Sequence, residues 1–385
     1  MSIYQITSES VTEGHPDKIC DQISDAILDA YLTQDPFSHV AVECMISQRL
    51  LVIAGEVKSN AIVDVEKIAR ETLVKIGYIS DEIGIDAHNC YVIQNIHQQS
   101  PDITQGVLKE STEIGAGDQG IIFGYACKET DQLMPLPITL AHQLTKKLTE
   151  LRKDGILSYL LPDGKSQVTV EYTEDGHPLR VTDIIVSTQH RANISTQQLQ
   201  SDLLVNLIKP VIPSSLLNEQ TKILINPTGR FVTGGPKGDV GLTGRKIIVD
   251  TYGGLIPHGG GAFSGKDGTK LDRSGAYMAR YAAKNIVAAD LADRCQISVS
   301  YAIGIAKPVS YYINTYGTEK IPLEYLYAAV TTIFDFTPKG IIEKLELRKP
   351  IFSDTSTYGH FKNNQYPWEK INQVELLKEL RKVVI

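Results

Sequence analysis

Apolar residues recur along the chain with helical spacing in some segments and strand spacing in others. Every fourth residue from Ile19 to Tyr31 is large and apolar, which predicts a helix over residues 17–34. After it, the pattern predicts strands at 39–46 and 50–57, a helix around 63–76 and a strand at 91–96. The first quarter of the chain is therefore expected to form one unit of helix, hairpin, helix and strand.

The same order of elements recurs twice. A second unit is expected to have a helix at 138–152, strands at 167–172 and 179–188, a helix near 197–208 and a strand at 222–225. Asp175-Gly176 between its first two strands is a hairpin signal. A third unit is expected to have a helix at 272–288, strands at 296–303 and 309–315 and a helix near 323–334. Its closing strand is not evident. The pattern predicts three similar α+β units, each a sheet covered on one face by helices.

A polar connection at 98–113 separates the first two units. Loops of this length in compact proteins are often lids or binding loops, and a disordered linker is the alternative.

Composition narrows the class of protein. A chain of 385 residues is long enough for two or three domains. The net charge of −7 argues against broad nucleic-acid or membrane binding, although a basic pocket for one polyphosphate remains compatible with it. No signal peptide and no apolar run of about 20 residues is evident. The five cysteines are scattered without metal-site spacing, so we expect reduced, buried thiols and a cytoplasmic protein.

Two glycine motifs resemble nucleotide-binding signatures without matching their context. Residues 115–120 fit G-x-G-x-x-G, but the strand-like segment 121–125 follows, whereas a dinucleotide fingerprint opens a helix. Residues 260–267 nearly fit the P-loop, after a strand-like segment at 246–252, but Asp267 replaces the Ser or Thr that binds the metal. A glycine-rich loop with a lysine still suits phosphate, and a flexible turn is the alternative.

The segment Gly14-His15-Pro16-Asp17-Lys18 places proline where a helix should start. The free N–H groups of a helix start attract phosphate, to which His15 could donate, while Asp17 could bind magnesium. The alternative is a routine helix cap, with the aspartate stabilising the dipole by under about 1 kcal/mol.

Three segments together carry a resemblance to one family. GHPDK (14–18), GAGDQG (115–120) and GGGAFSGKD (259–267) are similar to the signature segments of S-adenosylmethionine synthetases, also called methionine adenosyltransferases. The resemblance extends along nearly the whole chain and is strongest to bacterial members. Further matching segments are 8–11, 163–167, 226–231 and 241–246.

The resemblance implies three similar α+β domains around a pseudo-threefold axis, expected at 1–102, 112–232 and 233–385, with a mobile active-site loop at 99–108. It implies a homodimer, commonly paired into a tetramer, with active sites at the subunit interface. The implied reaction is attack of the methionine sulfur on C5′ of ATP, with hydrolysis of the expelled triphosphate to pyrophosphate and phosphate.

Site residues carry over position by position. The implied triphosphate contacts are His15, Lys165, Arg245, Lys246 and Lys266. Asp17 and Asp272 would hold two magnesium ions per site, and Glu43 one potassium ion per subunit. Asp163, Arg230, Phe231 and Ala262 would contact the adenosine portion. Glu56, Gln99, Asp239, Lys270 and Ile303 would recognise methionine, with Asp239 also near ATP. The residues alone favour a solvated strand position for Glu43 and ordinary core packing for Phe231.

Two departures from bacterial relatives affect expectations within this site. Gln98 replaces a common lysine and the loop is one residue shorter, which bears on the closing rate of the loop. Val240 replaces a cysteine, so thiol reagents should not inactivate the enzyme through that position.

Two rival functions follow from the same motifs. Another ATP-dependent phosphotransferase using the near-P-loop would release ADP. A non-catalytic regulatory subunit would have lost some of the residues that the resemblance implies, whereas all of them are present.

Overall fold

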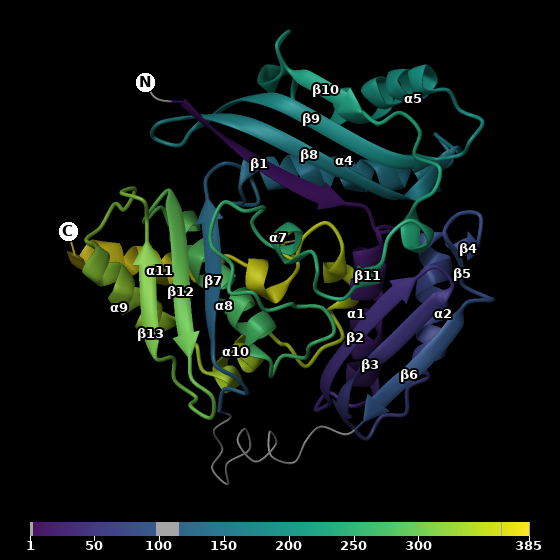
Figure 1. Ribbon diagram of the computed structural model, residues 1–385. Helices are drawn as coiled ribbons and strands as arrows, with labels where there is room; N and C mark the ends of the chain where they lie inside the picture. Colours follow the sequence, from purple (N-terminus) through teal and green to yellow (C-terminus); the bar gives the residue numbers. More distant parts are fainter. Residues whose placement is uncertain (1–2, 98–114, 363, 385) are drawn as a thin grey trace.

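The computed structural model describes residues 3–97, 115–362 and 364–384, and three sheets with helices packed behind them dominate it (Figure 1). The expected connection at 98–113, including the loop at 99–108 and Gln99, lies outside the described residues.

The first quarter of the chain forms the expected unit. Its elements are β1 (Ile3–Val11), α1 (Pro16–Gln34), β2 (His39–Ser47), β3 (Leu50–Lys58), α2 (Val65–Ile76), β4 (Ile79–Ser80), β5 (Ile85–Asp86) and β6 (Tyr91–His97). The β2–β3 hairpin is antiparallel, and β6 closes the unit parallel to β3. Pro16 occupies the first position of α1, as the sequence predicts, and His15 caps the helix.

The second and third units repeat this order. The second contains β7 (Gly120–Cys127), α4 (Leu136–Lys153), β8 (Leu160–Thr173), β9 (Pro178–His190), α5 (Thr196–Leu203), η1 (Leu204–Ile208), α6 (Lys209–Val211), η2 (Ser214–Leu216) and β10 (Lys222–Ile225). The third contains η3 (Gly235–Lys237), β11 (Gly241–Leu242), α7 (Ile247–Asp250), α8 (Leu271–Ala288), β12 (Arg294–Tyr301), β13 (Ser310–Asn314), α9 (Leu323–Ile333), α10 (Pro338–Lys344), η4 (Ser353–Ser356), η5 (Pro367–Glu369) and α11 (Val374–Val384).

Each unit gives one strand to the sheet of another unit. The sheet orders are β11-β2-β3-β6, β1-β8-β9-β10 and β7-β12-β13, so β1, β7 and β11 each sit on the first hairpin strand of a different unit. The exchange is cyclic: the first unit gives to the second, the second to the third and the third to the first. This arrangement fits the predicted threefold repeat. It also shows that the third sheet, within the described residues, has no parallel closing strand.

Helices α1, α4 and α8 each cover the sheet of their own unit. The central unit has its own core beneath α4, with Leu144 and Val168 fully buried. The first and third units share one continuous core that includes Ile23 of α1 and Met278 of α8. The third unit is therefore joined to the first by apolar packing as well as by β11.

Four local expectations are corrected. The strand expected at 246–252 is the short helix α7, because its apolar residues follow a turn rather than pairing with a sheet. The strand expected from 167 starts at Leu160, and the strand expected to reach 303 ends at Tyr301. The helix expected over 197–208 changes to π-helical hydrogen bonding at Leu204.

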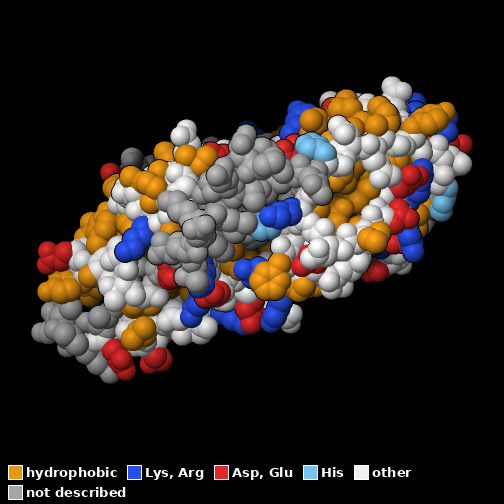
Figure 2. Space-filling view, turned by 90° about the horizontal axis from the view of Figure 1, so that it is seen from below, with side chains coloured by type: hydrophobic (Ala, Val, Ile, Leu, Met, Phe, Trp, Pro, Cys, Tyr) orange, Lys and Arg blue, Asp and Glu red, His pale blue; other side chains and the backbone are white. Residues whose placement is uncertain are grey.

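All five cysteines are free and buried, as predicted. Within the residues described, none of the helices combines the length and the apolar character that crossing a bilayer requires. On the face shown in Figure 2, basic and acidic side chains are interspersed near the middle, beside the undescribed residues, rather than gathered by sign. This distribution agrees with the sequence argument against a broad basic surface.

Candidate active site

The start of α1 brings a histidine and a carboxylate together in a buried position. His15 Nδ1 accepts a hydrogen bond from the Asp17 amide at 3.2 Å, so the neutral ring carries its proton on Nε2. Burial, followed by the charges of Lys246 and Lys165, lowers the pKa of His15 to about 3. His15 is therefore neutral at physiological pH and can donate through Nε2 without carrying charge.

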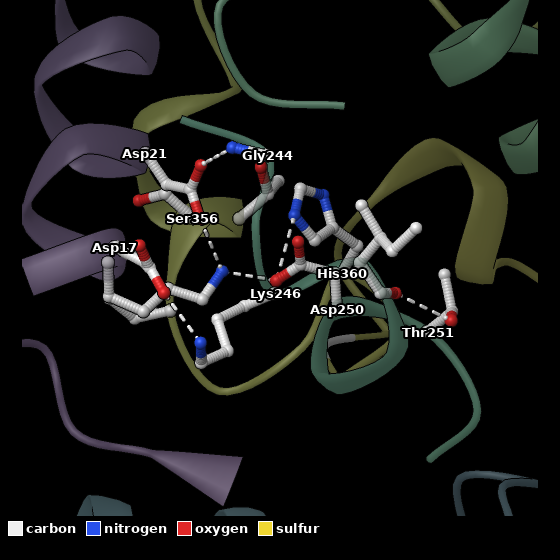
Figure 3. A network of polar contacts seen from close by, with 12 residues as sticks. Asp17, Asp21, Gly244, Lys246, Asp250, Thr251, Ser356 and His360 are labelled. Atoms are coloured by element: carbon white, nitrogen blue, oxygen red, sulfur yellow. Dashed lines mark hydrogen bonds and ion pairs between the residues drawn. The ribbon is translucent and has the colours of Figure 1, made fainter. Parts of the chain in front are cut away.

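Asp17 joins α1 to β11 and to the segment that follows it. Its Oδ1 accepts from the Leu242 amide at 3.0 Å. Its Oδ2 accepts from Lys246 Nζ at 2.5 Å (Figure 3). Burial alone would raise the pKa of Asp17, but Lys246 and the Leu242 amide bring it below its ordinary value. The carboxylate is thus ionised and paired with a lysine that the sequence predicts to contact phosphate.

A second group of predicted residues lies around β8. Asp163 is buried, with Oδ2 accepting from the Gly235 amide at 2.8 Å and Oδ1 without a hydrogen-bond partner among the described residues. Burial raises its pKa to about 6. Phe231 is half-buried and its ring lies against Gly234, where a Cβ would come within 2.8 Å of ring carbon Cε2. Lys165, two residues after Asp163, is exposed.

The glycine-rich loop carries the third group. Lys266 Nζ contacts Asp272 Oδ2 at 2.6 Å, and both side chains are partly exposed. Gly261 packs directly on Asp272, since a Cβ there would lie 2.2 Å from Oδ1. Glycine is therefore required at this position for the loop to approach the helix start.

Asp267, which stands where a P-loop has Ser or Thr, has a structural role in this loop. Its Oδ2 accepts from the Val40 amide at 2.6 Å and is paired with Lys270, and its Oδ1 accepts from the Thr269 amide. The buried carboxylate thus ties the loop to β2. Lys270, predicted to contact methionine, is held here by Asp267.

The glycine-rich loop also contacts the segment that carries Arg245 and Lys246, and so lies close to the residues around Asp17. A Cβ on Gly244 would lie 2.3 Å from Ala262 Cβ, so the loop touches the segment that carries Arg245 and Lys246. The structure therefore brings the predicted phosphate residues of both groups onto neighbouring backbone segments.

The remaining predicted residues are scattered around these groups. Arg230, Asp239 and Arg245 are exposed, and Ala262 is half-buried. Glu43 is exposed on β2, and Glu56 on β3 lies 3.6 Å from His97 Nε2. Ile303 is 61% exposed in the turn after β12. No described contact joins Glu43, Glu56 or Ile303 to the residues predicted to bind the triphosphate, so their roles stay predictions.

Sequence reasoning missed a stripe of aspartates on α1. Asp17, Asp21, Asp25 and Asp29 recur every four residues, and each accepts backbone N–H groups from a loop of the third unit. Their partners are the amides of Leu242, Gly244, Gly265 and Phe352, respectively. A four-residue acidic period beside an apolar period was the available signal, and an exposed face is its usual interpretation.

Comparison with protein families matches three models in succession. They are the S-adenosylmethionine synthetase N-terminal domain at residues 3–101, the central domain at 113–231 and the C-terminal domain at 233–370. The chain belongs to the S-adenosylmethionine synthetase family. It is therefore a methionine adenosyltransferase, with ATP and methionine as substrates.

S-adenosylmethionine synthetases need metal ions, and the residues here fit a metal that binds together with phosphate. No three metal-ligating side chains converge among the described residues. Asp17 and Asp272 are instead single carboxylates, each at the second position of a helix and each beside a lysine. Magnesium is commonly held in this way, by one or two carboxylates plus substrate oxygens.

Proposed function

We propose that the chain makes S-adenosylmethionine by attack of the methionine sulfur on C5′ of ATP, followed by hydrolysis of the triphosphate to pyrophosphate and phosphate. The thioether has no proton to lose, so the first step requires no general base. The enzyme has to align the substrates and stabilise a departing polyanion.

The observation that carries this proposal is the matched pair of lysine–aspartate contacts. Asp17 and Asp272 lie in the first turns of α1 and α8, and Lys246 and Lys266 contact them at 2.5 and 2.6 Å. Magnesium would supply neutralisation of the phosphate charge when held by these aspartates. The two lysines would then be free to contact phosphate oxygens.

The other residues take complementary roles in this proposal. His15 holds its proton on Nε2 toward the oxygen that leaves C5′, and Lys165 and Arg245 add positive charge from exposed positions. Asp163, one oxygen of which has no hydrogen-bond partner in the described part of the chain, binds the adenosine portion beside Phe231. Arg230 and Ala262 complete the adenosine contacts. Glu56, Gln99, Asp239, Lys270 and Ile303 are proposed for methionine.

The proposal includes two magnesium ions per site and one potassium ion at Glu43. It also includes a homodimer or dimer of dimers in the cytoplasm, with active sites between subunits. The exposed phosphate residues Lys165 and Arg245 support a site that a second subunit completes.

One experiment tests the reaction. Purified protein is incubated with ATP, isotopically labelled methionine, magnesium and potassium, and mass spectrometry follows the products. We expect a labelled sulfonium product together with pyrophosphate and phosphate. Release of ADP, or nucleotide turnover independent of methionine, would support the rival phosphotransferase instead.

A further inference from the structure

The segment that carries Arg245 and Lys246 lies along the first turns of α1 and contacts them at several points. Gly241 packs on the backbone of Pro16, where a Cβ would lie 2.2 Å from the carbonyl carbon. Farther along the segment, the Gly244 amide donates to Asp21 Oδ1 at 2.8 Å. At its far end, Asp250 forms an ion pair with Lys18 (Figure 3). Both ends of the segment are thus held by the helix that carries Asp17.

The far attachment is a buried charge cluster. Lys18 and Asp21 are completely buried, and the Asp250 side chain is 3% exposed. Lys18 Nζ lies 3.0 Å from Asp21 Oδ2 and also contacts Asp250, while His360 Nε2 lies 3.9 Å from Asp250 Oδ1. Such a cluster holds its geometry strongly, because separating its members would leave a charge buried without a partner.

Fixing Asp250 also fixes the backbone at Lys246. One helical turn, α7, joins the two residues, and the Asp250 amide donates to the Lys246 carbonyl at 2.9 Å. The Lys246 ammonium is held separately, by Asp17. If Asp17 turns to a metal, this side-chain contact is lost, whereas the Lys18–Asp250 pair stays in place.

We infer that Lys18 and Asp250 are positioning residues, which keep the 242–250 segment on α1 and so keep Lys246 and Arg245 directed at the triphosphate. Neither residue touches substrate in this arrangement. The inference rests on the proposed function, because it presupposes that Lys246 contacts phosphate and that Asp17 binds a metal.

The test compares two neutralised carboxylates. Asp250→Asn keeps the shape of the side chain and removes its charge. Glu369→Gln is the matched control, because Glu369 is also buried in a charge cluster. Its carboxylate accepts from Arg280 and Lys284, which lie in the C-terminal half of α8, away from the Lys18–Asp250 pair. Both variants should lose thermal stability, so kinetics are measured at a temperature where circular dichroism shows both folded.

For Asp250→Asn we expect kcat/KM for ATP to fall about 10- to 100-fold, as for a displaced catalytic group, with the KM for methionine unchanged. Hydrolysis of added tripolyphosphate should fall in parallel. For Glu369→Gln we expect both activities to stay within about twofold of wild type. Equal losses in the two variants, or an unchanged Asp250→Asn enzyme, would overturn the inference.

The outcomes also separate this inference from the proposed function. If the wild-type protein makes no sulfonium product, the proposed function fails. If the wild type is active and Asp250→Asn matches it, only the positioning role fails. Should Asp250→Asn not fold, Asp21→Asn applies the same comparison, because it weakens the other side of the Lys18 cluster and retains an oxygen for the Gly244 amide.

Discussion

At the scale of residues, the site is assembled from lysine–aspartate contacts whose partners are distant in sequence or separated by a loop. Lys246 reaches Asp17 across 229 positions, while Lys266 reaches Asp272 across six. Each pair places a carboxyl group and a lysine side chain at the start of a helix, where the dipole also favours anions. In the proposed mechanism, such pairs would hold the charges for a metal–triphosphate complex before that complex arrives.

The first prediction concerns Lys266→Ala. Removing its ammonium should cut kcat about 100- to 1000-fold, by analogy with the loss of one donor to a developing anion. Stability should fall by less than about 1 kcal/mol, because the pair with Asp272 is partly exposed. Steady-state kinetics and urea denaturation measure the two effects. Lys349→Ala, which removes an exposed lysine beside Glu346, is the control. Proportionate losses of activity and stability in Lys266→Ala would remove it from the phosphate site.

The second prediction concerns pH and Asp163. Its folded pKa of about 6 exceeds the ordinary 3.8, so the folded protein retains a proton that the unfolded chain releases first. The resulting stability is present below the unfolded pKa and is lost as pH rises through about 6. Asp163→Asn cannot ionise and should gain on the order of 2–3 kcal/mol relative to wild type between about pH 4 and pH 7.5.

Urea denaturation of ligand-free protein at both pH values measures this gain, and ATP affinity of the same variant should fall. A stability difference that does not change with pH would show that Asp163 is not the group responsible.

At the scale of elements, close backbone approaches set how helices and strands meet. On β7, Gly124 faces α8, where a Cβ would lie 2.1 Å from the Ala279 carbonyl carbon. Gly120 on the same strand has open space around its Cβ position. The aspartate stripe of α1 acts similarly, since its carboxylates hold loop amides directly against the helix.

The third prediction uses these two glycines as a matched pair. Gly124→Ala should destabilise the protein by about 1–3 kcal/mol, because the helix backbone must move away from the strand. Gly120→Ala should be neutral within about 0.5 kcal/mol. Chemical denaturation of both variants gives the comparison, and equal effects would contradict the close packing of β7 on α8.

At the scale of the whole molecule, cyclic strand exchange makes the three units interdependent. Each of the three large sheets takes one strand from a different unit, so none of these sheets is built by one unit alone. The same exchange places β11, and with it the Lys246 segment, beside α1. The architecture that ties the units together thus also brings Lys246 to Asp17, two of the residues proposed for the triphosphate and its metal.

The fourth prediction concerns the proposed subunit interface. If a complete site takes the Asp17 group from one subunit and the Asp272 group from another, Asp17→Asn and Asp272→Asn enzymes should each be inactive. Subunits mixed and allowed to exchange should regain about one quarter of wild-type activity, because half of the dimers are mixed and each has one intact site. Absence of recovery, despite subunit exchange shown by native mass spectrometry, would place both groups of a site in one subunit.

The chain's local patterns determined the repeat of helix, hairpin, helix and strand, the helix start at Pro16, the buried thiols and the signature segments of the family. These features depend on neighbouring residues, whose spacing is visible in one dimension. Local spacing also misassigned α7, because a short apolar run has the same pattern in a strand and in a buried helical turn.

Only the tertiary structure decided which strands are exchanged and which charges are buried together. Nothing local marks β1 as the partner of β8, or Lys18 as the partner of Asp250. Both pairings arise because folding brings distant segments within hydrogen-bonding distance, where burial makes an unpaired polar group costly. That cost selects the partners, and it depends on the surroundings of each residue in space rather than on its place along the chain.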